Sequence, residues 1–426
     1  MKRKVVITGL GLVTPLGIDV EENWREALAG ISGISILSLN GASGCAIQAV
    51  GAVCAEDWEK IMEKFPEEAR TEGERRTLFA LWASKAALED SGLIFHPGKR
   101  ERWGVTFAAG LGIYSPQDIR RWLLSDGSFD LISFGRECSK VRSESMVRNP
   151  SHRAASIVAK KFGLAGLNCT VTSACASATQ AIGAGYRAIQ RGEADVGVTG
   201  GSDSMINPLG LVGFVLLQAA AGGSGDPQAA CRPFDRKRSG LVIGEGAGVA
   251  ILEEESHALG RRAKIYGEVG GYGSSMDGYQ VTAPHPQGLG AALSMRNALR
   301  DGGLKPETID YVNAHGTGTK LNDAAETIAV KEVFKDAAYR IAISSSKSLI
   351  GHLMAAAGGP EFVFTVLSVQ RDEIHPTINL ANPDPKCDLD YVPNVKRTRR
   401  VRAALSNSFG FGGQNGSIVV KKYGGH

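Results

Sequence analysis

Short apolar runs alternate along the chain with longer segments of helical periodicity. In residues 77–90 the apolar side chains recur at close to the 3.6-residue spacing of a helix, and Gly92 follows as a stop signal. Residues 111–150 show poor periodicity, and we expect them to leave the core. In the first part of the chain the predicted strands are 4–8, 103–108, 168–172, 196–199 and 249–252, and the predicted helices are 77–90 and 176–190.

A second series of strands and helices begins after a charged stretch. It opens as the first series does, with a strand and then closely spaced glycines: Gly9-Leu10-Gly11 in one, Gly270-Gly271-Tyr272-Gly273 in the other. The alternation predicts an α/β fold. The similar openings indicate a duplication, with halves 1–260 and 261–426. In the second series the predicted strands are 264–269, 309–313, 341–344 and 417–421, and the predicted helices are 323–334 and 360–371.

Composition narrows the class of protein. The chain has 426 residues, of which 43% are hydrophobic and 22% charged, as in a folded globular protein. Its net charge of +4 comes without a basic stripe carrying aromatics, so we expect no nucleic-acid binding, and the charge suits an acidic protein partner. Seven cysteines without a C-x-x-C pair argue against a disulfide framework or a zinc site. Since no signal peptide or membrane-spanning run is found, we expect a cytoplasmic protein.

One cysteine lies where a strand gives way to a helix. Thr172-Ser173-Ala174-Cys175-Ala176-Ser177 joins the strand 168–172 to an alanine-rich helix. A thiol at a helix N-terminus lies near the positive end of the helix dipole, which lowers the thiol pKa and favours the thiolate. Its small neighbours leave room for a substrate carbonyl. Taken alone, such a cysteine is more often a buried structural residue.

A histidine follows a predicted strand in the second half. His315 comes directly after the strand 309–313, in a loop with two glycines and two threonines. Taken alone, a histidine in this position is structural more often than not. Downstream, Asp323 and Glu326 have the spacing of a capping box, so we assign them to capping the next helix.

A second histidine, His352, follows the strand 341–344 in the same way. Lys347 lies between that strand and His352, and Glu361 lies in the next helix, so we expect an ion pair beside the site. The segment 406–415 is rich in glycine and phenylalanine. Such a loop brings backbone N–H groups close to a ligand, or else it is an ordinary glycine turn before the last strand.

The order Cys, His, His, each placed after a predicted strand, is much more specific than any one of these signals. Over essentially its whole length the chain resembles the elongating β-ketoacyl-acyl-carrier-protein synthases of type II fatty acid synthesis. The segments that carry the resemblance are Val5-Val6-Ile7-Thr8-Gly9-Leu10-Gly11, the Cys175 segment, Arg232-Pro233-Phe234-Asp235, Gly244-Glu245-Gly246-Ala247-Gly248, His315-Gly316-Thr317-Gly318-Thr319, Lys347, Gly351-His352 and Phe409-Gly410-Phe411-Gly412-Gly413.

The resemblance implies a duplicated thiolase-like fold, with two mixed five-stranded sheets in a five-layer α-β-α-β-α arrangement. It implies condensation of an acyl thioester on Cys175 with malonyl-acyl-carrier protein, with loss of CO₂, in fatty acid or polyketide elongation. The acyl carrier protein is the implied partner, and no metal or cofactor is implied beyond its phosphopantetheine. The implied roles are Cys175 as acyl acceptor, His315 and His352 in decarboxylation, Lys347 and Glu361 as supporting ion pair, the amides of Cys175 and Phe411 as oxyanion hole, Phe411 as gate, Thr317 and Thr319 on phosphopantetheine, Ile113 in the acyl pocket, and Arg75 and Arg76 in carrier docking.

The chemistry agrees with these residue types. A thiolate is both a good nucleophile and a good leaving group for moving an acyl group from the carrier to the enzyme. Two neutral imidazole N–H donors stabilise the enolate that forms when CO₂ leaves, at roughly a few kcal/mol per well-placed donor. Whether His315 also acts as a base stays open at this point.

Four positions depart from the usual pattern of the family: Lys320 replaces a common proline, Gln414 a frequent threonine, and Ala176 and Leu241 are less usual choices. They leave open a secondary-metabolite ketosynthase and a heterodimer with an inactive homologue, beside the homodimer that the resemblance favours. A noncatalytic subunit like a chain-length factor, a biosynthetic thiolase and a dinucleotide-binding dehydrogenase fit less well. The presence of the cysteine and both histidines argues against the noncatalytic subunit. The glycine motif near residue 9 lacks its third glycine, which argues against the dehydrogenase.

Overall fold

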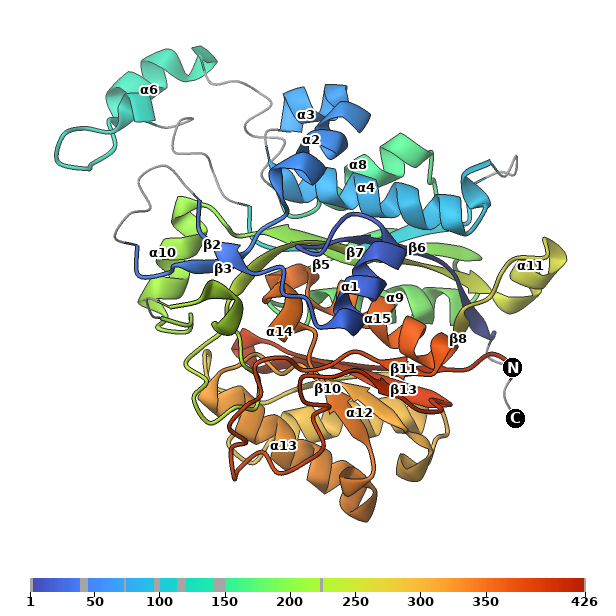
Figure 1. The fold of residues 1–426 in the computed structure, drawn as a ribbon. Coiled ribbons are helices and arrows are strands. Elements are labelled where there is room, and N and C mark those ends of the chain that lie inside the picture. Colours follow the sequence, from blue (N-terminus) through green and yellow to red (C-terminus); the bar gives the residue numbers. More distant parts are fainter. Residues whose placement is uncertain are drawn as a thin grey trace.

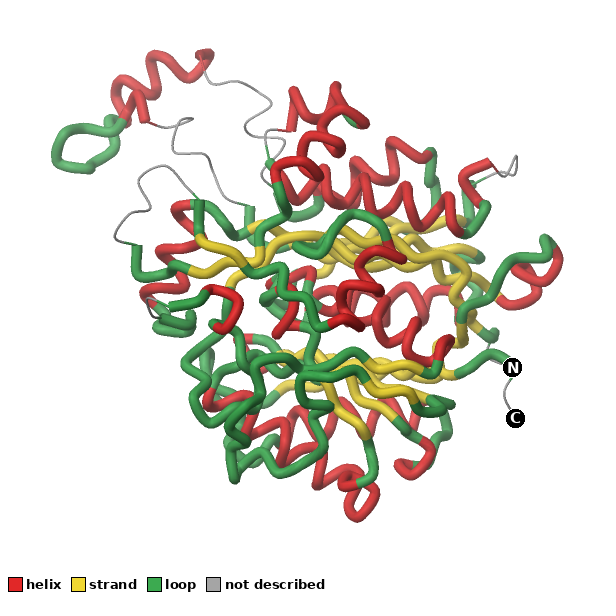
Figure 2. The backbone as a smooth tube through the Cα atoms, in the orientation of Figure 1, coloured by secondary structure: helices red, strands yellow, loops and turns green. Residues whose placement is uncertain are grey.

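The structure is a computed structural model in which two stacked sheets occupy the centre (Figures 1 and 2). Among the described residues, no helix is both long and apolar enough to cross a membrane. The described residues are 3–38, 45–72, 74–95, 100–112, 120–140, 150–222 and 225–424.

The first sheet consists of β1 (Val5–Val13), β4 (Trp103–Ala109), β5 (Asn168–Val171), β6 (Val196–Ser204) and β7 (Ile243–Glu254). Their order is β1-β7-β6-β4-β5. β7 pairs antiparallel with β1 and β6, whereas β4 pairs in parallel with β5 and β6. β1 and β4 are buried along their whole length, as strands covered on both faces are, which explains their continuous apolar sequences.

The second sheet consists of β8 (Gly267–Met276), β9 (Tyr311–Asn313), β10 (Ala342–Ser344), β13 (Ala403–Phe409) and β14 (Gln414–Lys421), in the order β10-β9-β13-β14-β8. β9 is parallel to β10 and β13, and β14 is antiparallel to β13 and β8. A short antiparallel pairing of β1 with β8 joins the two sheets at one edge. The hydrogen-bonded path therefore runs through ten strands, five in each sheet.

Helices form three layers around these sheets (Figure 1). One layer covers the outer face of the first sheet, one lies between the sheets, and one covers the outer face of the second sheet. This arrangement confirms the α/β fold with five layers. In chain order within these layers, the helices are α4 (Arg75–Asp90) and α8 (Arg153–Phe162), then α9 (Ser177–Gln190) and α15 (Gly358–Arg371), then α12 (Leu289–Asp301) and α13 (Lys320–Phe334).

The remaining elements are short or lie at the periphery. The short helix α6 stands away from the body (Figure 1), as expected for the segment of poor periodicity, of which residues 113–119 and 141–149 lie outside the described part. These elements are α1 (Val20–Ala29), α2 (Ala55–Lys64), α3 (Pro66–Glu72), α6 (Leu131–Glu137), α10 (Pro208–Leu216), α11 (Glu255–Gly260), α14 (Lys347–Ile350), β2 (Ser35–Ile36), β3 (Ala49–Gly51), β11 (Glu373–Ile374) and β12 (Arg397–Thr398).

One central strand escapes the sequence prediction. β13 is buried over its full length, although Ser406, Asn407 and Ser408 are polar. The Asn407 side chain accepts a hydrogen bond from Ser417 on β14 at 2.8 Å, so polar partners inside the fold replace water. A hydropathy pattern cannot identify a strand whose buried positions are polar.

Candidate active site

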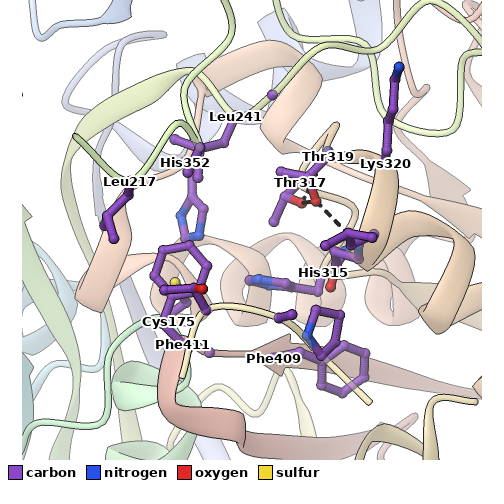
Figure 3. Close-up of a pocket in the computed structure, with 18 of the residues that line it drawn as sticks. Cys175, Leu217, Leu241, His315, Thr317, Thr319, Lys320, His352, Phe409 and Phe411 are labelled. Atoms are coloured by element: carbon purple, nitrogen blue, oxygen red, sulfur yellow. Dashed lines mark hydrogen bonds between the residues drawn. The ribbon is translucent and has the colours of Figure 1, made fainter. Parts of the chain in front are cut away.

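Three side chains from three different segments meet at the bottom of one cavity. Cys175 follows β5, His315 follows β9, and His352 follows α14. The Cys175 sulfur and one nitrogen of each histidine all lie within 4.8 Å of one another. All three line a cavity of about 490 Å³ (Figure 3). The structure therefore brings together the three residues that the sequence singled out.

The local backbone presents Cys175 in a tight turn. Ala174 adopts a left-handed conformation with φ of 48°, which is unusual for a residue with a side chain and is typical of constrained turns at functional sites. α9 begins two residues later, at Ser177. Gly410 lies against this turn: a Cβ at this glycine would come within 3.1 Å of the Cys175 nitrogen. A side chain at Gly410 would therefore push the loop of residues 410–413 away from the cysteine.

Lys347 and Glu361 form the expected ion pair beside the histidines. Their side chains are 1% and 2% exposed, and they contact each other directly. The Lys347 ammonium also lies 3.3 Å from Nδ1 of His315. Burial raises the pKa of Glu361 to about 7, although Lys347 opposes that rise. The pair is thus a buried ion pair whose lysine contacts His315 of the reactive cluster.

Both histidines are held neutral, each with Nε2 as the protonated nitrogen. Burial lowers the pKa of His315 and of His352 well below the ordinary value, and the charge of Lys347 adds to this effect. The Met354 amide donates to Nδ1 of His352 at 3.1 Å, and the Lys347 ammonium faces Nδ1 of His315. The proton must then sit on Nε2. Nε2 of His352 is buried and has no partner among the described residues.

The thiol of Cys175 departs from the sequence expectation. Burial raises its pKa to about 11, and this effect exceeds the lowering by the Lys347 charge and by the backbone N–H groups of Phe411 and Cys175. The expectation of a lowered pKa from the helix dipole is therefore wrong. Desolvation of a thiolate outweighs the field of a helix terminus when the sulfur is buried, as in Cys175.

We expect alkylation of Cys175 by iodoacetamide to accelerate about tenfold per pH unit between about pH 7 and pH 10, because the thiolate fraction grows that way below a pKa of about 11. The measurement is the rate of Cys175 modification, followed by peptide mass spectrometry. A rate that is already constant near neutral pH would contradict this expectation and would indicate that an imidazole takes the thiol proton.

The glycine and phenylalanine loop lies next to the cysteine and is not a free turn. The backbone N–H groups of Phe411 and of Cys175 itself both interact with the Cys175 sulfur and lower the pKa of the thiol. The Gly412 amide donates to the Val281 carbonyl at 2.6 Å, and the Asp277 amide donates to the Gly413 carbonyl at 2.8 Å. These hydrogen bonds hold the loop that carries Phe411 against the wall of the cavity.

The two threonines expected on the phosphopantetheine path lie higher in the same cavity (Figure 3). Their hydroxyl oxygens, Oγ1 of Thr317 and Oγ1 of Thr319, are 3.0 Å apart. The Thr319 hydroxyl also accepts from the Asn322 amide at 3.3 Å and caps α13. Both threonines are therefore held in place by the start of this helix.

The capping-box interpretation of Asp323 and Glu326 is wrong. α13 begins at Lys320, so both residues lie inside the helix and are buried. Glu326 accepts hydrogen bonds from the amides of His315 and Gly316 at 2.9 and 2.8 Å, and burial raises its pKa to about 7. It positions the histidine loop. The signal that could have revealed it is an acidic residue on the otherwise small and apolar inner side of the helix.

Asp323 does the same for a neighbouring loop, since its carboxylate accepts from the amides of Phe234 and Gly318 at 2.8 and 3.2 Å.

Ile113, expected in the acyl pocket, lies outside the described residues. Of the other predicted site residues in the second half of the chain, Lys347 contacts His315, Glu361 contacts Lys347, and the rest line the cavity: His315, Thr317, Thr319, His352 and Phe411.

The expectation that Arg76 docks a carrier protein is wrong, because its side chain is only 3% exposed and donates to the carbonyls of Gly110 and Leu111. Arg75 is partly exposed, but its guanidinium is bound to the buried carboxylate of Glu245 at 2.7 Å and lies over the Trp58 ring at 4.4 Å. The structure thus gives this arginine pair a role in the fold.

We expect Arg75→Ala to destabilise the protein by about 3 kcal/mol, because it leaves Glu245 buried without its cation. The measurement is the free energy of unfolding in urea. The matched control is Lys85→Ala on the same helix, which removes an ion pair with Glu89. The Glu89 side chain is 40% exposed whereas that of Glu245 is 2% exposed, so this substitution should cost only about 0.5 kcal/mol. Equal effects of the two substitutions would show that the Arg75–Glu245 pair contributes no more than a surface pair.

Comparison with known proteins places this geometry in a family. Residues 2–258 match the family model of the beta-ketoacyl synthase N-terminal domain, and residues 266–381 match that of the C-terminal domain. The sequence is 42% identical over 424 residues to 3-oxoacyl-[acyl-carrier-protein] synthase 2 of Synechocystis sp., with 99% of both chains covered.

Solved structures agree. One similar chain comes from the structure of AntDE:AntF, a type II PKS acyl-carrier protein in complex with its ketosynthase bound to the hexaketide. The superposition has a TM-score of 0.88 at 33% identity and covers 99% of this chain and 100% of that one. With a TM-score of 0.84 and 30% identity, the whole chain superimposes on a whole chain of the ishigamide ketosynthase/chain length factor. The nucleophile cavity, the two-sheet fold and the sequence all point the same way: the chain belongs to the β-ketoacyl synthase family.

Proposed function

We propose that the chain is an elongating β-ketoacyl-acyl-carrier-protein synthase, which forms a carbon–carbon bond between an acyl group and a malonyl unit. The observation that carries this proposal is the meeting of the Cys175 sulfur with two neutral imidazoles within 4.8 Å. The acyl half-reaction needs a nucleophile, and the malonyl half-reaction needs hydrogen-bond donors for an enolate. One cavity supplies both.

In the first half-reaction Cys175 attacks the carbonyl carbon of an acyl thioester carried on phosphopantetheine. The sulfur–carbon bond to the carrier breaks, the carrier thiol leaves with the proton from Cys175, and the acyl group stays on the enzyme. We assign the amides of Cys175 and Phe411 as donors to the tetrahedral oxyanion. Both N–H groups lie within hydrogen-bond reach of the sulfur to which the oxyanion carbon is attached. Lys347 favours the thiolate electrostatically.

In the second half-reaction a malonyl thioester enters the same cavity. Loss of CO₂ leaves an enolate, whose oxygen accepts hydrogen bonds from Nε2–H of His315 and His352. The enolate carbon then attacks the acyl-Cys175 carbonyl, which releases the cysteine thiolate and gives the β-ketoacyl-carrier product. Neutral imidazoles suit this role because they donate without forming an ion pair, which would hold the enolate too tightly.

The two halves 1–260 and 261–426 divide this chemistry in our proposal. The first half carries the nucleophile, and the second carries both histidines, Lys347 and Glu361. Sheet topology supports the division, because every strand of the first sheet ends by Glu254 and every strand of the second begins at or after Gly267.

The experiment that tests the proposed function maps the acyl-enzyme and the product. The protein is incubated with a panel of acyl-carrier thioesters of different chain lengths, and the modified peptide is identified by mass spectrometry. We expect the adduct on Cys175 and, after addition of malonyl-carrier, a β-ketoacyl product two carbons longer. An adduct on another cysteine, or none, would overturn the proposal, and the preferred donor would identify the pathway.

We propose that the protein works as a homodimer joined through β5. This strand is last in its sheet, its outer edge is unpaired among the described residues, and its side chains are exposed or half-buried. Two β5 edges related by a twofold axis would continue one sheet into the other. The similarity to a ketosynthase/chain length factor supports a second candidate, a heterodimer with a homologous subunit.

We expect the purified chain to sediment as a dimer in analytical ultracentrifugation. The reason is that the unpaired edge of a strand such as β5 is seldom left open to solvent. A stable monomer that dimerises only after a homologous subunit is added would contradict the homodimer and favour the heterodimer.

A further inference from the structure

The cavity that ends at Cys175 changes character along its length. Cys175, His315 and His352 lie at one end, Thr317 and Thr319 follow, and Lys320 lies beyond them (Figure 3). In the figure the Lys320 amine points away from the cysteine, and the side chain is exposed. Lys320 is the only lysine or arginine among the described residues that line this cavity.

The charge of Lys320 is available to a ligand. The side chain is exposed and forms no ion pair or hydrogen bond with any other described residue. The other charged wall residue of the cavity, Asp277, is engaged by the His285 amide at 2.9 Å and by the Asn415 side chain at 2.8 Å. An anion at the mouth would therefore meet a free ammonium and an acid that is already hydrogen-bonded.

The backbone under Lys320 is held firmly. The buried guanidinium of Arg238 donates to the carbonyls of Thr319 and Lys320 at 3.0 and 3.2 Å, and its own charge is matched by Asp384 and Asp323. Lys320 is also the first residue of α13, and no described residue accepts a hydrogen bond from its amide or from the amide of Leu321. The positive end of the helix dipole thus reinforces the side-chain charge.

We propose that Lys320 binds the phosphate of the phosphopantetheine arm at the mouth of the cavity. This inference rests on the proposed function. A phosphopantetheine thioester carries, in order, a phosphate, a hydroxyl with two amides, and the thioester. The cavity offers, in the same order, a free cation with helix amides, two threonine hydroxyls, and the cysteine with its two histidines. Lys320 is therefore a specificity-determining residue that distinguishes a phosphorylated arm from an unphosphorylated one.

The test uses two small donors, S-octanoyl-phosphopantetheine and S-octanoyl-pantetheine, so that docking of a carrier protein has no part in the result. The readout is the second-order rate constant for acylation of Cys175, by mass spectrometry. We expect the wild-type protein to prefer the phosphorylated donor by roughly three- to tenfold, as for one exposed charge pair aided by helix amides. Lys320→Gln should remove the preference and Lys320→Arg should retain it.

The matched control is Lys237→Gln, an exposed lysine that lines a neighbouring cavity sharing Ser239 with this one. We expect this variant to keep the wild-type preference. Equal rates for the two donors in the wild type, or loss of the preference with Lys237→Gln but not with Lys320→Gln, would overturn the assignment. Failure of both donors to acylate Cys175, when acyl-carrier protein also fails, would instead count against the proposed function.

Discussion

Cys175→Ala is expected to reduce acyl transfer and condensation by roughly 10⁴-fold or more, because the only sulfur in the cavity among the described residues is removed and no acyl-enzyme forms. Malonyl decarboxylation should persist in this variant. The enolate is stabilised by the two Nε2–H donors, and these do not depend on the cysteine: Nδ1 of His352 is bound to the Met354 amide and Nδ1 of His315 faces Lys347.

The measurement compares three rates: formation of acyl-enzyme, release of CO₂ from malonyl-carrier, and formation of product. The matched control is Cys231→Ala, which truncates another fully buried cysteine that does not line the cavity. We expect all three rates per folded molecule to survive in the control. Continued condensation with Cys175→Ala, or loss of condensation with Cys231→Ala, would contradict the assignment of the nucleophile.

The sequence predicted the reactive residues because a cysteine and two histidines each follow a predicted strand, in an order that matches the resembled family. Cys175, His315 and His352 come after β5, β9 and the segment that β10 opens, and the ends of neighbouring strands bring distant parts of a chain together. A strand that is a short apolar run is identifiable from the sequence, and so are the positions after it, although β5 is largely polar and half-exposed. The alternation of strands and helices predicted the α/β class, and the five-layer arrangement was implied by the family resemblance.

What the sequence could not predict depends on burial. Arg76 looks like a surface charge at a helix start, but it packs against the carbonyls of Gly110 and Leu111. Glu326 has capping-box spacing, but it lies nearly two turns inside the helix and holds the His315 loop. The thiol of Cys175 has a raised pKa because it is enclosed, which a helix-dipole argument omits. In each case a local pattern is overruled by what covers the side chain.

His352→Ala and His315→Ala are each expected to slow malonyl decarboxylation by about 10²- to 10³-fold, because one of the two donors to the enolate oxygen is lost. Acyl transfer to Cys175 should change much less. The proposed oxyanion donors for that step are the amides of Cys175 and Phe411, which both substitutions leave in place. The measurement is CO₂ release from malonyl-carrier beside the burst of acyl-enzyme, on the same preparation.

His375→Ala is the matched control for these histidine variants, since His375 is also fully buried but packs against Tyr311 and Phe364, away from the cavity. It should lower stability without separating the two half-reactions. His352→Gln places an amide N–H donor about as far from the backbone as Nε2 and should recover part of the decarboxylation that alanine loses. If alanine at His315 and His352 reduced both half-reactions equally, as a general loss of structure would, the imidazoles would be scaffolding for the cysteine. A selective loss of decarboxylation, partly restored by glutamine, requires a hydrogen bond to the enolate.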